Sequence, residues 1–254
     1  MENQKYGLTD KVFVITGGSR GIGLELARRL LQEKARVAIC ARKQEGLDLA
    51  AKELNGGDAL LTVPAHIAKE IEVDNLFKQT YSRFGKIDAL INNVGMNLLT
   101  PSVTETEAAT WQKIIDSNLT GTYYCSRAAA KIMKGQGGGK IISISSLAAC
   151  RAAPGMGIYG IAKAGIEMLT KVLAAELARD NIQVNAVAPC MVKTGFSSPF
   201  WSNRDVHDEV VKGIPIGRLA EIQDIVDPVL FLCSAGADFI TGQIIAIDGG
   251  ASAV

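Results

Sequence analysis

Short apolar runs alternate with segments of helical periodicity along nearly the whole chain, and this alternation limits the folds that it can adopt. The apolar runs predict strands at residues 11–16, 36–41, 59–64, 87–92, 140–145, 182–188 and 243–247. The segments between them predict helices at residues 21–34, 45–54, 69–84, 107–134, 158–179 and 222–233. Apolar strands that alternate with helices are typical of a parallel sheet covered on both faces. We therefore predict the α/β class, with a single doubly wound parallel sheet.

The composition fits one domain and argues against several classes of partner. No Pro-, Gly- or Ser-rich linker divides the 254 residues, so we expect residues 1–254 to form a single domain. The 27 basic and 26 acidic residues leave a net charge of +1, which argues against nucleic acid or an anionic membrane as partner. No apolar run approaches the ~20 residues of a membrane span, and the first residues are polar. The five cysteines are scattered without metal-site spacing, so we expect a cytoplasmic protein with reduced thiols and no metal.

A glycine-rich turn follows the first predicted strand. Residues 16–23 read Thr-Gly-Gly-Ser-Arg-Gly-Ile-Gly, with Gly17, Gly21 and Gly23 leading into the first predicted helix. Glycine permits positive φ and lets a phosphate approach the backbone amides at a helix N-terminus. The spacing T-G-x-x-x-G-x-G is also compatible with a purely structural turn. Its position after the first strand of an alternating chain favours nucleotide binding.

The end of the second predicted strand indicates which dinucleotide would bind. Sites that prefer NAD usually hold the ribose 2′-hydroxyl with a carboxylate there. Here Ala41 occupies that place and Arg42 follows it, while Arg20 lies in the glycine turn. Two arginines without an acid suit a 2′-phosphate, although both would also be ordinary in solvent. We therefore expect NADP(H) as cofactor, with NAD(H) as the less favoured alternative.

Tyr159 and Lys163 are the clearest catalytic candidates. They lie four residues apart in a predicted helix, so both side chains share one face. A free phenol has a pKa near ~10, and a lysine cation one turn away would stabilise the phenolate and lower that pKa. We expect such a lowered pKa to let Tyr159 act as acid and base near neutral pH.

These residues, together with motifs elsewhere in the chain, resemble the short-chain dehydrogenase/reductase family across essentially the whole sequence. The family's N-N-A-G motif is matched by residues 92–95, with Val94 in place of alanine. Its helix asparagine corresponds to Asn118, and its catalytic serine to Ser146, thirteen residues before Tyr159. The order and spacing of these motifs indicate the family more strongly than any one of them alone.

The resemblance implies a Rossmann fold and hydride transfer between nicotinamide and a ketone or secondary alcohol. It implies that Tyr159 exchanges a proton with the substrate oxygen and that Ser146 hydrogen-bonds to that oxygen. Lys163 would lower the pKa of Tyr159 and bind the nicotinamide ribose, and Asn118 would hold a water of a proton relay. The cofactor-binding residues implied are Gly17, Ser19, Arg20, Gly21, Ile22, Gly23, Arg42, His66, Ile67, Asn92, Gly95, Tyr159, Lys163, Pro189, Val192 and Thr194.

Some positions depart from the family's pattern. His66 stands where members commonly have an acid that touches the adenine amino group; its ring can still contact adenine, or it can be an ordinary loop histidine. Cys190 replaces the glycine of the P-G motif after the sixth predicted strand. We expect Cys190 and Cys150 to pack or to line the pocket, since neither has an evident base partner for a nucleophilic role. Ser145, beside the family's serine position, is expected to be structural.

Residues 195–212 would form a lid over the substrate, because the family folds this segment over its pocket. The substrate-binding residues that we expect are Met96, Ser146, Met156, Phe196, Phe200 and Trp201. An apolar pocket of this kind suits a hydrophobic ketone or acyl chain. An equally acceptable interpretation is that the aromatic side chains anchor the lid or meet another subunit.

The function that fits best is an NADP(H)-dependent carbonyl reductase that acts on a small ketone or alcohol. The nearest alternative is a 3-oxoacyl-[acyl-carrier-protein] reductase, and a catalytically silent nucleotide-binding protein is an alternative from another class. Docking of an acyl carrier protein would need a basic patch near the pocket, for which the candidates are Lys131, Lys134, Lys140 and Arg179. The resemblance also implies a homotetramer, with the helices at 107–134 and 158–179 packed across one interface.

Overall fold

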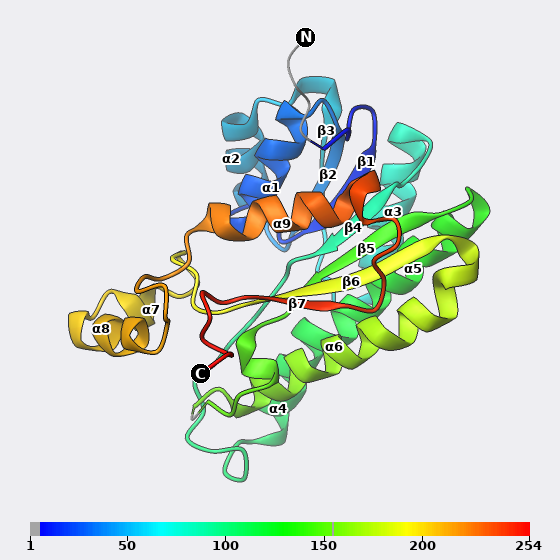
Figure 1. Ribbon diagram of the computed structural model, residues 1–254. Coiled ribbons are helices and arrows are strands. Elements are labelled where there is room, and N and C mark those ends of the chain that lie inside the picture. Colours follow the sequence, from blue (N-terminus) through cyan, green and yellow to red (C-terminus); the bar gives the residue numbers. More distant parts are fainter. Residues whose placement is uncertain (1–5, 154) are drawn as a thin grey trace.

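Parallel strands form one sheet at the centre of the molecule (Figure 1). The computed structural model describes residues 6–153 and 155–254, without the side chains of Pro199 and Phe200. Within them the sheet has seven strands in the order β3-β2-β1-β4-β5-β6-β7, and every neighbouring pair is parallel. The strands are β1 (Val12–Thr16), β2 (Arg36–Ala41), β3 (Leu60–Pro64), β4 (Ala89–Asn92), β5 (Gly139–Ile144), β6 (Ile182–Pro189) and β7 (Ile244–Ile247). The predicted α/β class with a doubly wound parallel sheet is confirmed.

Two layers of helices cover the sheet, because both of its faces are apolar. Helices α1, α2 and α9 contribute to one buried cluster, and α3, α5 and α6 contribute to another (Figure 1). Helices α7 and α8 stand apart from both layers, on the left of Figure 1. The helices are α1 (Gly21–Gln32), α2 (Gln44–Leu54), α3 (Glu70–Phe84), α4 (Ala108–Ile115), α5 (Gly121–Gly135), α6 (Gly157–Leu177), α7 (Ser198–Trp201), α8 (Arg204–Lys212) and α9 (Ile222–Cys233).

The register of the central strands brings large apolar side chains together. Ile15 of β1 pairs with Ile39 of β2 on one side and Ile91 of β4 on the other, and all three are fully buried. Burying a side chain of this size contributes about 1.5–3 kcal/mol relative to leaving it exposed.

The described helices include none that is long and apolar enough to cross a membrane.

One π-helical turn interrupts the helix predicted at 107–134. Helix α4 ends at Ile115, the wider turn spans Asp116–Thr120, and α5 begins at Gly121. The Gly121 amide bonds to the carbonyl of Asp116, five residues back. Asn118 lies within this turn and bonds through its side chain to Met96, a tertiary contact that helical periodicity cannot report. Turns of this kind occur frequently at functional sites.

The strand order reverses between β1 and β4. The chain proceeds from β1 through β2 to β3 in one direction, then from β4 through β5 and β6 to β7 in the other. In sheets of this kind, ligands bind in the crevice outside the carboxyl ends of the strands at the reversal. The loops that leave β1, β4, β5 and β6 at this edge carry most of the residues that the sequence singled out.

Candidate active site

The glycine turn is held in shape by residues from the neighbouring strand end. Thr16 Oγ1 accepts hydrogen bonds from the backbone amides of Asn93 and Val94, at 3.0 and 3.2 Å. The Asn93 side chain donates to the carbonyls of Thr16 and Gly17, at 3.0 and 3.1 Å. Gly17 has a φ of +69°, which explains the glycine there. Sequence reasoning included Asn93 in the motif at 92–95 but gave it no role, because only the pairing of β1 with β4 brings it to the turn.

The first turn of α1 is open to an anion. Arg20 precedes the helix and makes no side-chain capping bond, so the protein leaves the first-turn amides uncapped. A Cβ built on Gly21 would have no atom within 4 Å, so the space in front of the helix end is free. Uncapped amides at a helix N-terminus bind phosphate well. The turn therefore fits the pyrophosphate of a dinucleotide.

Two arginines flank this crevice. Arg20 and Arg42 are exposed, and neither has an ion pair or side-chain hydrogen bond among the described residues. Ser19 lies close to the start of α2, since a Cβ on Gly46 would be 3.7 Å from Ser19 Cβ. The glycine turn and the end of β2 are thus neighbours. Ala41 at that strand end offers no carboxylate to oppose a phosphate.

Gly23→Ala should damage the turn and lower stability by about 1–3 kcal/mol, because overpacking costs that much. The added Cβ would lie 2.6 Å from Asn93 Nδ2 and even closer to the Gly17 carbonyl oxygen. We expect a lower Tm and weaker dinucleotide affinity, measured by thermal unfolding and by titration. Gly135→Ala is the matched control, since Gly135 lies in α5 with nothing near its Cβ position. Equal melting temperatures for parent and Gly23→Ala would contradict the steric argument.

Tyr159, Lys163 and Ser146 come together at the carboxyl ends of β5 and β6. Lys163 is 2% exposed and donates through Nζ to the carbonyl of Ile144 at 2.7 Å. Its Nζ lies 5.5 Å from the centre of the Tyr159 ring. Ser146 follows β5, and its Oγ accepts from the Ala148 amide at 3.2 Å. The shared helical face predicted for Tyr159 and Lys163 is thus present, with a serine beside it.

The pKa of Tyr159 is raised, and the expectation of a lowered pKa was wrong for this structure. Burial raises the pKa of Tyr159 to about 12, and a hydrogen bond with Ser146 offsets only part of that rise. Burial also lowers the pKa of Lys163 to about 8. Desolvation disfavours the charged form of each group, and here it outweighs their mutual attraction. The phenol is therefore held in its protonated form at neutral pH.

The side chain of Asn118 makes three hydrogen bonds to the protein backbone. Its Nδ2 donates to the carbonyls of Met96 and Ile114, both at 2.8 Å, and its Oδ1 accepts from the Met96 amide at 3.1 Å. A Cβ on Gly95 would lie 3.7 Å from Lys163 Nζ and 3.8 Å from Asn118 Oδ1, so a glycine keeps this space open. The side chain of Asn118 thus positions the loop after β4. The second lone pair of Oδ1 has no partner among these bonds, so it can still accept from a water of the kind expected at Asn118.

Asn92 is not placed for contact with a cofactor through its side chain. It is 3% exposed, and its Nδ2 donates to Ser126 Oγ at 3.0 Å and to Ser143 Oγ at 3.4 Å. These bonds tie β4 to α5 and β5, so the side chain points into the interior. If Asn92 contacts the cofactor as predicted, it can do so only through its main chain. Ser145 is likewise engaged, with a 2.8 Å bond to Glu167 of α6.

Other predicted cofactor residues lie at the same edge of the sheet. Pro189 ends β6, and Val192 forms a parallel bridge with Ala220. Thr194 bonds to Ser197 through its amide at 3.2 Å. Ile67 follows β3, is 4% exposed, and packs where a Cβ on Gly121 would collide with it. Ile22 and the glycines around it form the start of α1, so the structure brings the predicted set together around one edge.

In the segment 195–212, where we expect a lid, the side chain of Trp201 is bonded to the protein. Its indole Nε1 donates to the Thr194 carbonyl and to Ser197 Oγ, both at 3.1 Å, and Lys193 Nζ lies 5.7 Å from its ring centre. Ser197 Oγ also donates to the Val192 carbonyl. Phe196, in contrast, is 46% exposed and free to meet a ligand. The structure therefore favours anchoring for Trp201 and leaves pocket lining open for Phe196.

The remaining predicted lining residues are less constrained. Met96 is fixed through its backbone by Asn118, and the partly exposed Met156 immediately precedes α6. Phe200 lies in α7, and its side chain is outside the described part of the structure.

The backbone at position 190 does not require a glycine. It is not among the described non-glycine residues with positive φ, so a side chain is accommodated there without backbone strain. Its thiol is half-buried, and burial raises its pKa. Cys150 is exposed and bonds weakly to the Leu147 carbonyl. Neither thiol has a partner in these contacts that would activate it as a nucleophile.

The predicted basic patch does not lie beside the site. Lys134 pairs with Asp180 at 3.0 Å, and Lys140 pairs with Asp238 at 2.8 Å and is 8% exposed. Lys131 and Lys134 belong to the last part of α5, which immediately precedes the amino end of β5. Since the candidate catalytic residues lie at the carboxyl end of that strand, these lysines, which were only candidates for a basic patch, do not lie near the pocket.

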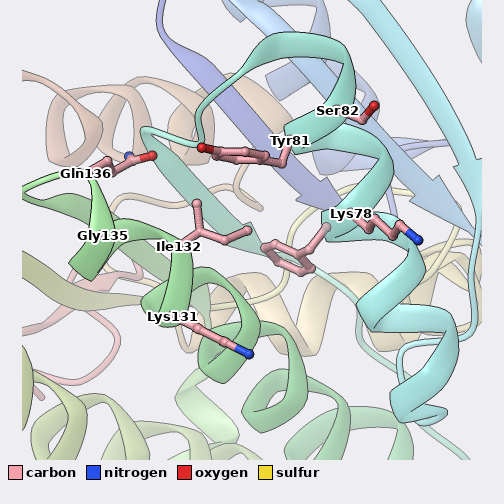
Figure 2. Close-up of a pocket in the computed structure, with 8 residues that line it drawn as sticks. Lys78, Tyr81, Ser82, Lys131, Ile132, Gly135 and Gln136 are labelled. Atoms are coloured by element: carbon pink, nitrogen blue, oxygen red, sulfur yellow. The ribbon is translucent and has the colours of Figure 1, made fainter.

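Two cavities in the described part of the structure also lie away from the candidate catalytic residues. A groove of about 620 Å³ runs between α3 and α5 and is lined by Lys78, Tyr81, Lys131 and Ile132, among others (Figure 2). A second cavity of about 390 Å³ lies at the amino-terminal edge of the sheet. Neither is lined by Ser146 or Tyr159. Among the residues described, no cluster of three or more His, Cys, Asp or Glu is arranged to hold a metal.

Comparison with known proteins agrees with this geometry. The family model for enoyl-(acyl carrier protein) reductase matches residues 17–252. Human dehydrogenase/reductase SDR family member 4 is 34% identical over 244 residues, which cover 96% of this chain and 88% of that protein. A 3α-hydroxysteroid dehydrogenase of Mediterraneibacter gnavus is 37% identical over 247 residues, covering 96% of this chain and 98% of that protein.

A solved structure extends the similarity to three dimensions. A gluconate 5-dehydrogenase from Burkholderia cenocepacia, in complex with NADP and tartrate, superposes with a TM-score of 0.93 at 31% identity. The match covers 99% of this chain and 98% of that one. The chain therefore belongs to the short-chain dehydrogenase/reductase family, whose members are oxidoreductases of carbonyl and alcohol groups.

Proposed function

We propose that the protein is an NADP(H)-dependent carbonyl reductase that acts on a small ketone or secondary alcohol. The observation that carries this proposal is the cluster of Tyr159, Lys163 and Ser146 at the same sheet edge as an uncapped helix N-terminus. A silent binding protein would have no need of a buried lysine beside a tyrosine, since burying a cation is costly. When bound, NADP(H) supplies or accepts the hydride.

The residues of the chain would transfer the proton, stabilise charge and position the reacting groups. Tyr159 would donate its phenolic proton to the carbonyl oxygen, and its raised pKa keeps that proton in place at neutral pH. Ser146 would hydrogen-bond to the same oxygen and stabilise the charge that develops there. Lys163 would bind the nicotinamide ribose and stabilise the phenolate that forms once the proton has left. Asn118 would hold the loop after β4 in position.

The dinucleotide would lie along the carboxyl edge of the sheet. The amides of Gly21, Ile22 and Gly23 would face its pyrophosphate, with Gly17 allowing close approach. Val192 and Thr194, after β6, would hold the nicotinamide end. The similarity to a gluconate 5-dehydrogenase solved with NADP supports a dinucleotide of this type.

Arg20 and Arg42 support a preference for the phosphorylated dinucleotide. Both are exposed at the crevice without ion pairs in the described structure, and no acid stands at Ala41. We expect NADPH to bind at least about tenfold more tightly than NADH, since a charge-assisted hydrogen bond contributes about 1.5–3 kcal/mol. Arg42→Ala should reduce the difference in affinity between NADPH and NADH. Arg83→Ala should leave that difference unchanged, because it removes an exposed arginine of α3 that pairs with Asp58, away from the crevice. Fluorescence titration of the parent and both variants measures all six affinities, and tighter binding of NADH by the parent would contradict the charge argument.

The substrate is proposed to be a free ketone and not a carrier-bound acyl group. The exposed Phe196 and the loop residue Met96 would give the site apolar walls. The lysines that would dock an acyl carrier protein are at the opposite edge of the sheet, and two of them are neutralised by aspartates. NADPH oxidation with a ketone panel that includes acetoacetyl-acyl carrier protein tests this choice. A large preference for the carrier-bound substrate would reverse it.

We further propose a homotetramer in the cytoplasm. Apolar side chains remain exposed on the helices named for the predicted interface, among them Trp111, Tyr123, Ile161, Met168 and Val172. A surface of this kind commonly marks an interaction site. All five cysteines are free, which suits a reducing compartment.

A further inference from the structure

A hydrogen bond between Ser145 and Glu167 joins the end of β5 to helix α6. Ser145 is 3% exposed, and its amide donates to the Val187 carbonyl of β6 at 2.7 Å. Its hydroxyl donates to Glu167 Oε1 at 2.8 Å. A second acceptor, the Lys163 carbonyl, lies 3.5 Å from the same Oγ, at the limit of a hydrogen bond. The Glu167 carboxylate is therefore the main partner of this buried hydroxyl.

Two further bonds flank this one and join the same two parts of the molecule. Lys163 Nζ donates to the carbonyl of Ile144, the residue before Ser145, at 2.7 Å. Ser146, the residue after it, has a side-chain hydrogen bond with Tyr159. The three partners on α6 follow one another at intervals of four residues, so they share one face of the helix. Three successive residues at the end of β5 are thus attached to one helix face.

The attachment of Ser145 bears directly on the position of Ser146. The hydroxyl of Ser146 accepts from the Ala148 amide at 3.2 Å, a bond that orients it within its own turn. The bond from Ser145 is different, because it ties the preceding residue to the helix that carries Tyr159. A group that stabilises developing charge must be held close to its productive geometry, and a misplacement of about 1 Å can cost about 10²-fold in rate.

We propose that Glu167 is a positioning residue, which acts through Ser145 to set the place of Ser146 relative to Tyr159. This inference rests on the proposed reductase function and adds one residue to it. Removing the acceptor at Glu167 should lower kcat, because the serine and the phenol would no longer be held together as closely. The affinity for the dinucleotide should change little, since the amides proposed to face the pyrophosphate belong to α1.

A set of variants on both sides of this bond tests the proposal. Glu167→Leu removes the acceptor, whereas Glu167→Gln keeps an amide oxygen that can accept from Ser145. Ser145→Ala removes the donor, and the double variant Ser145→Ala/Glu167→Leu removes both. Glu176→Leu is the matched control, because Glu176 is an exposed glutamate of the same helix. Steady-state reduction of a ketone gives kcat and KM, titration with NADPH gives the dinucleotide affinity, and thermal unfolding shows which variants are folded.

We expect Glu167→Leu and Ser145→Ala each to lower kcat by about tenfold, with NADPH affinity within about twofold of the parent. The double variant should be no slower than the slower single variant by more than about twofold, because both single changes remove the same bond. Glu167→Gln should retain kcat within about threefold of the parent, since an acceptor remains. Glu176→Leu should turn over at the parent's rate. A residue with a merely structural role would change the Tm without this pattern in kcat.

Three outcomes would overturn the role of Glu167. They are a folded Glu167→Leu with the parent's kcat, a double variant whose loss is the product of the two single losses, and a Glu167→Gln as slow as Glu167→Leu. If Glu167→Leu does not fold, Ser145→Ala, the smaller change at the same bond, decides the question through its own kcat. A parent that reduces no ketone would instead overturn the proposed function, and the role of Glu167 with it.

Discussion

Tyr159→Phe is expected to lower kcat by about 10³-fold while changing dinucleotide affinity by less than about twofold. Positioned proton transfer contributes about 10²–10⁴-fold to catalysis, and the variant lacks the only group that we assign to it. The ring itself remains, with the Lys163 ammonium 5.5 Å from its centre in the parent, so packing changes little. Steady-state oxidation of NADPH with a ketone, together with binding titration, measures both quantities.

A second tyrosine provides the control for this substitution. Tyr81 is 50% exposed on α3 and lines the groove of Figure 2, away from the candidate site. Tyr81→Phe removes the same hydroxyl group and should leave kcat unchanged. Turnover by Tyr159→Phe at the parent's rate would show that another group transfers the proton.

Lys163→Met is expected to abolish most activity and yet to gain stability relative to the parent at neutral pH. The pKa of Lys163 falls from 10.5 to about 8 on folding, because burial disfavours the cation. The folded protein therefore binds fewer protons than the unfolded chain between about pH 8 and 10.5, so stability rises with pH across that window. Below it, the buried cation lowers stability by about 3 kcal/mol, an order-of-magnitude figure from the size of the shift. Methionine carries no charge, so the variant does not have this cost of burying a cation.

The difference between the two proteins should therefore shrink as pH rises. Urea unfolding at about pH 7, about pH 8.5 and about pH 10 would follow the free energy of unfolding of both proteins. The raised pKa of Tyr159 lowers stability above about pH 10 in parent and variant alike, so it largely cancels in the comparison. Lys131→Met on the exposed face of α5 is the control, because that side chain is solvated in both states. A difference for Lys163→Met that stays constant with pH would contradict the desolvation of Lys163.

The elements that the sequence predicted well are those whose pattern is local. The strand at 36–41 and the helix at 222–233 have the predicted bounds, because apolar runs and helical periodicity report burial directly. The shared face of Tyr159 and Lys163 likewise needs only helical spacing. For the same reason, the glycine turn was placed correctly at the end of β1.

Features that depend on tertiary contacts could not be predicted in this way. The π-helical turn accompanies the bonds between Asn118 and Met96, which lie 22 residues apart. The pKa of Tyr159 depends on how much protein surrounds the phenol, which spacing does not reveal. The sequence also does not show which of the two neighbouring asparagines points into the interior. In the structure Asn92 bonds to Ser126, whereas Asn93 bonds to the glycine turn. The positions of Lys131 and Lys134 were also hidden, because they depend on where α5 ends relative to the sheet. That end lies beside the amino end of β5, whereas the candidate catalytic residues lie at its carboxyl end.

The bonds between Thr16 and Asn93 mean that the glycine turn cannot keep its shape as an isolated segment. They join residues 77 positions apart, and they hold both backbone and side chain of Asn93. A peptide or graft that contained only residues 16–23 would keep the glycines but lose the support that shapes them. The smallest continuous part of this chain that contains the whole arrangement runs from the start of β1 to Val94. What evolution can exchange between proteins of this fold is therefore the pair of adjacent strand ends and not the glycine motif alone.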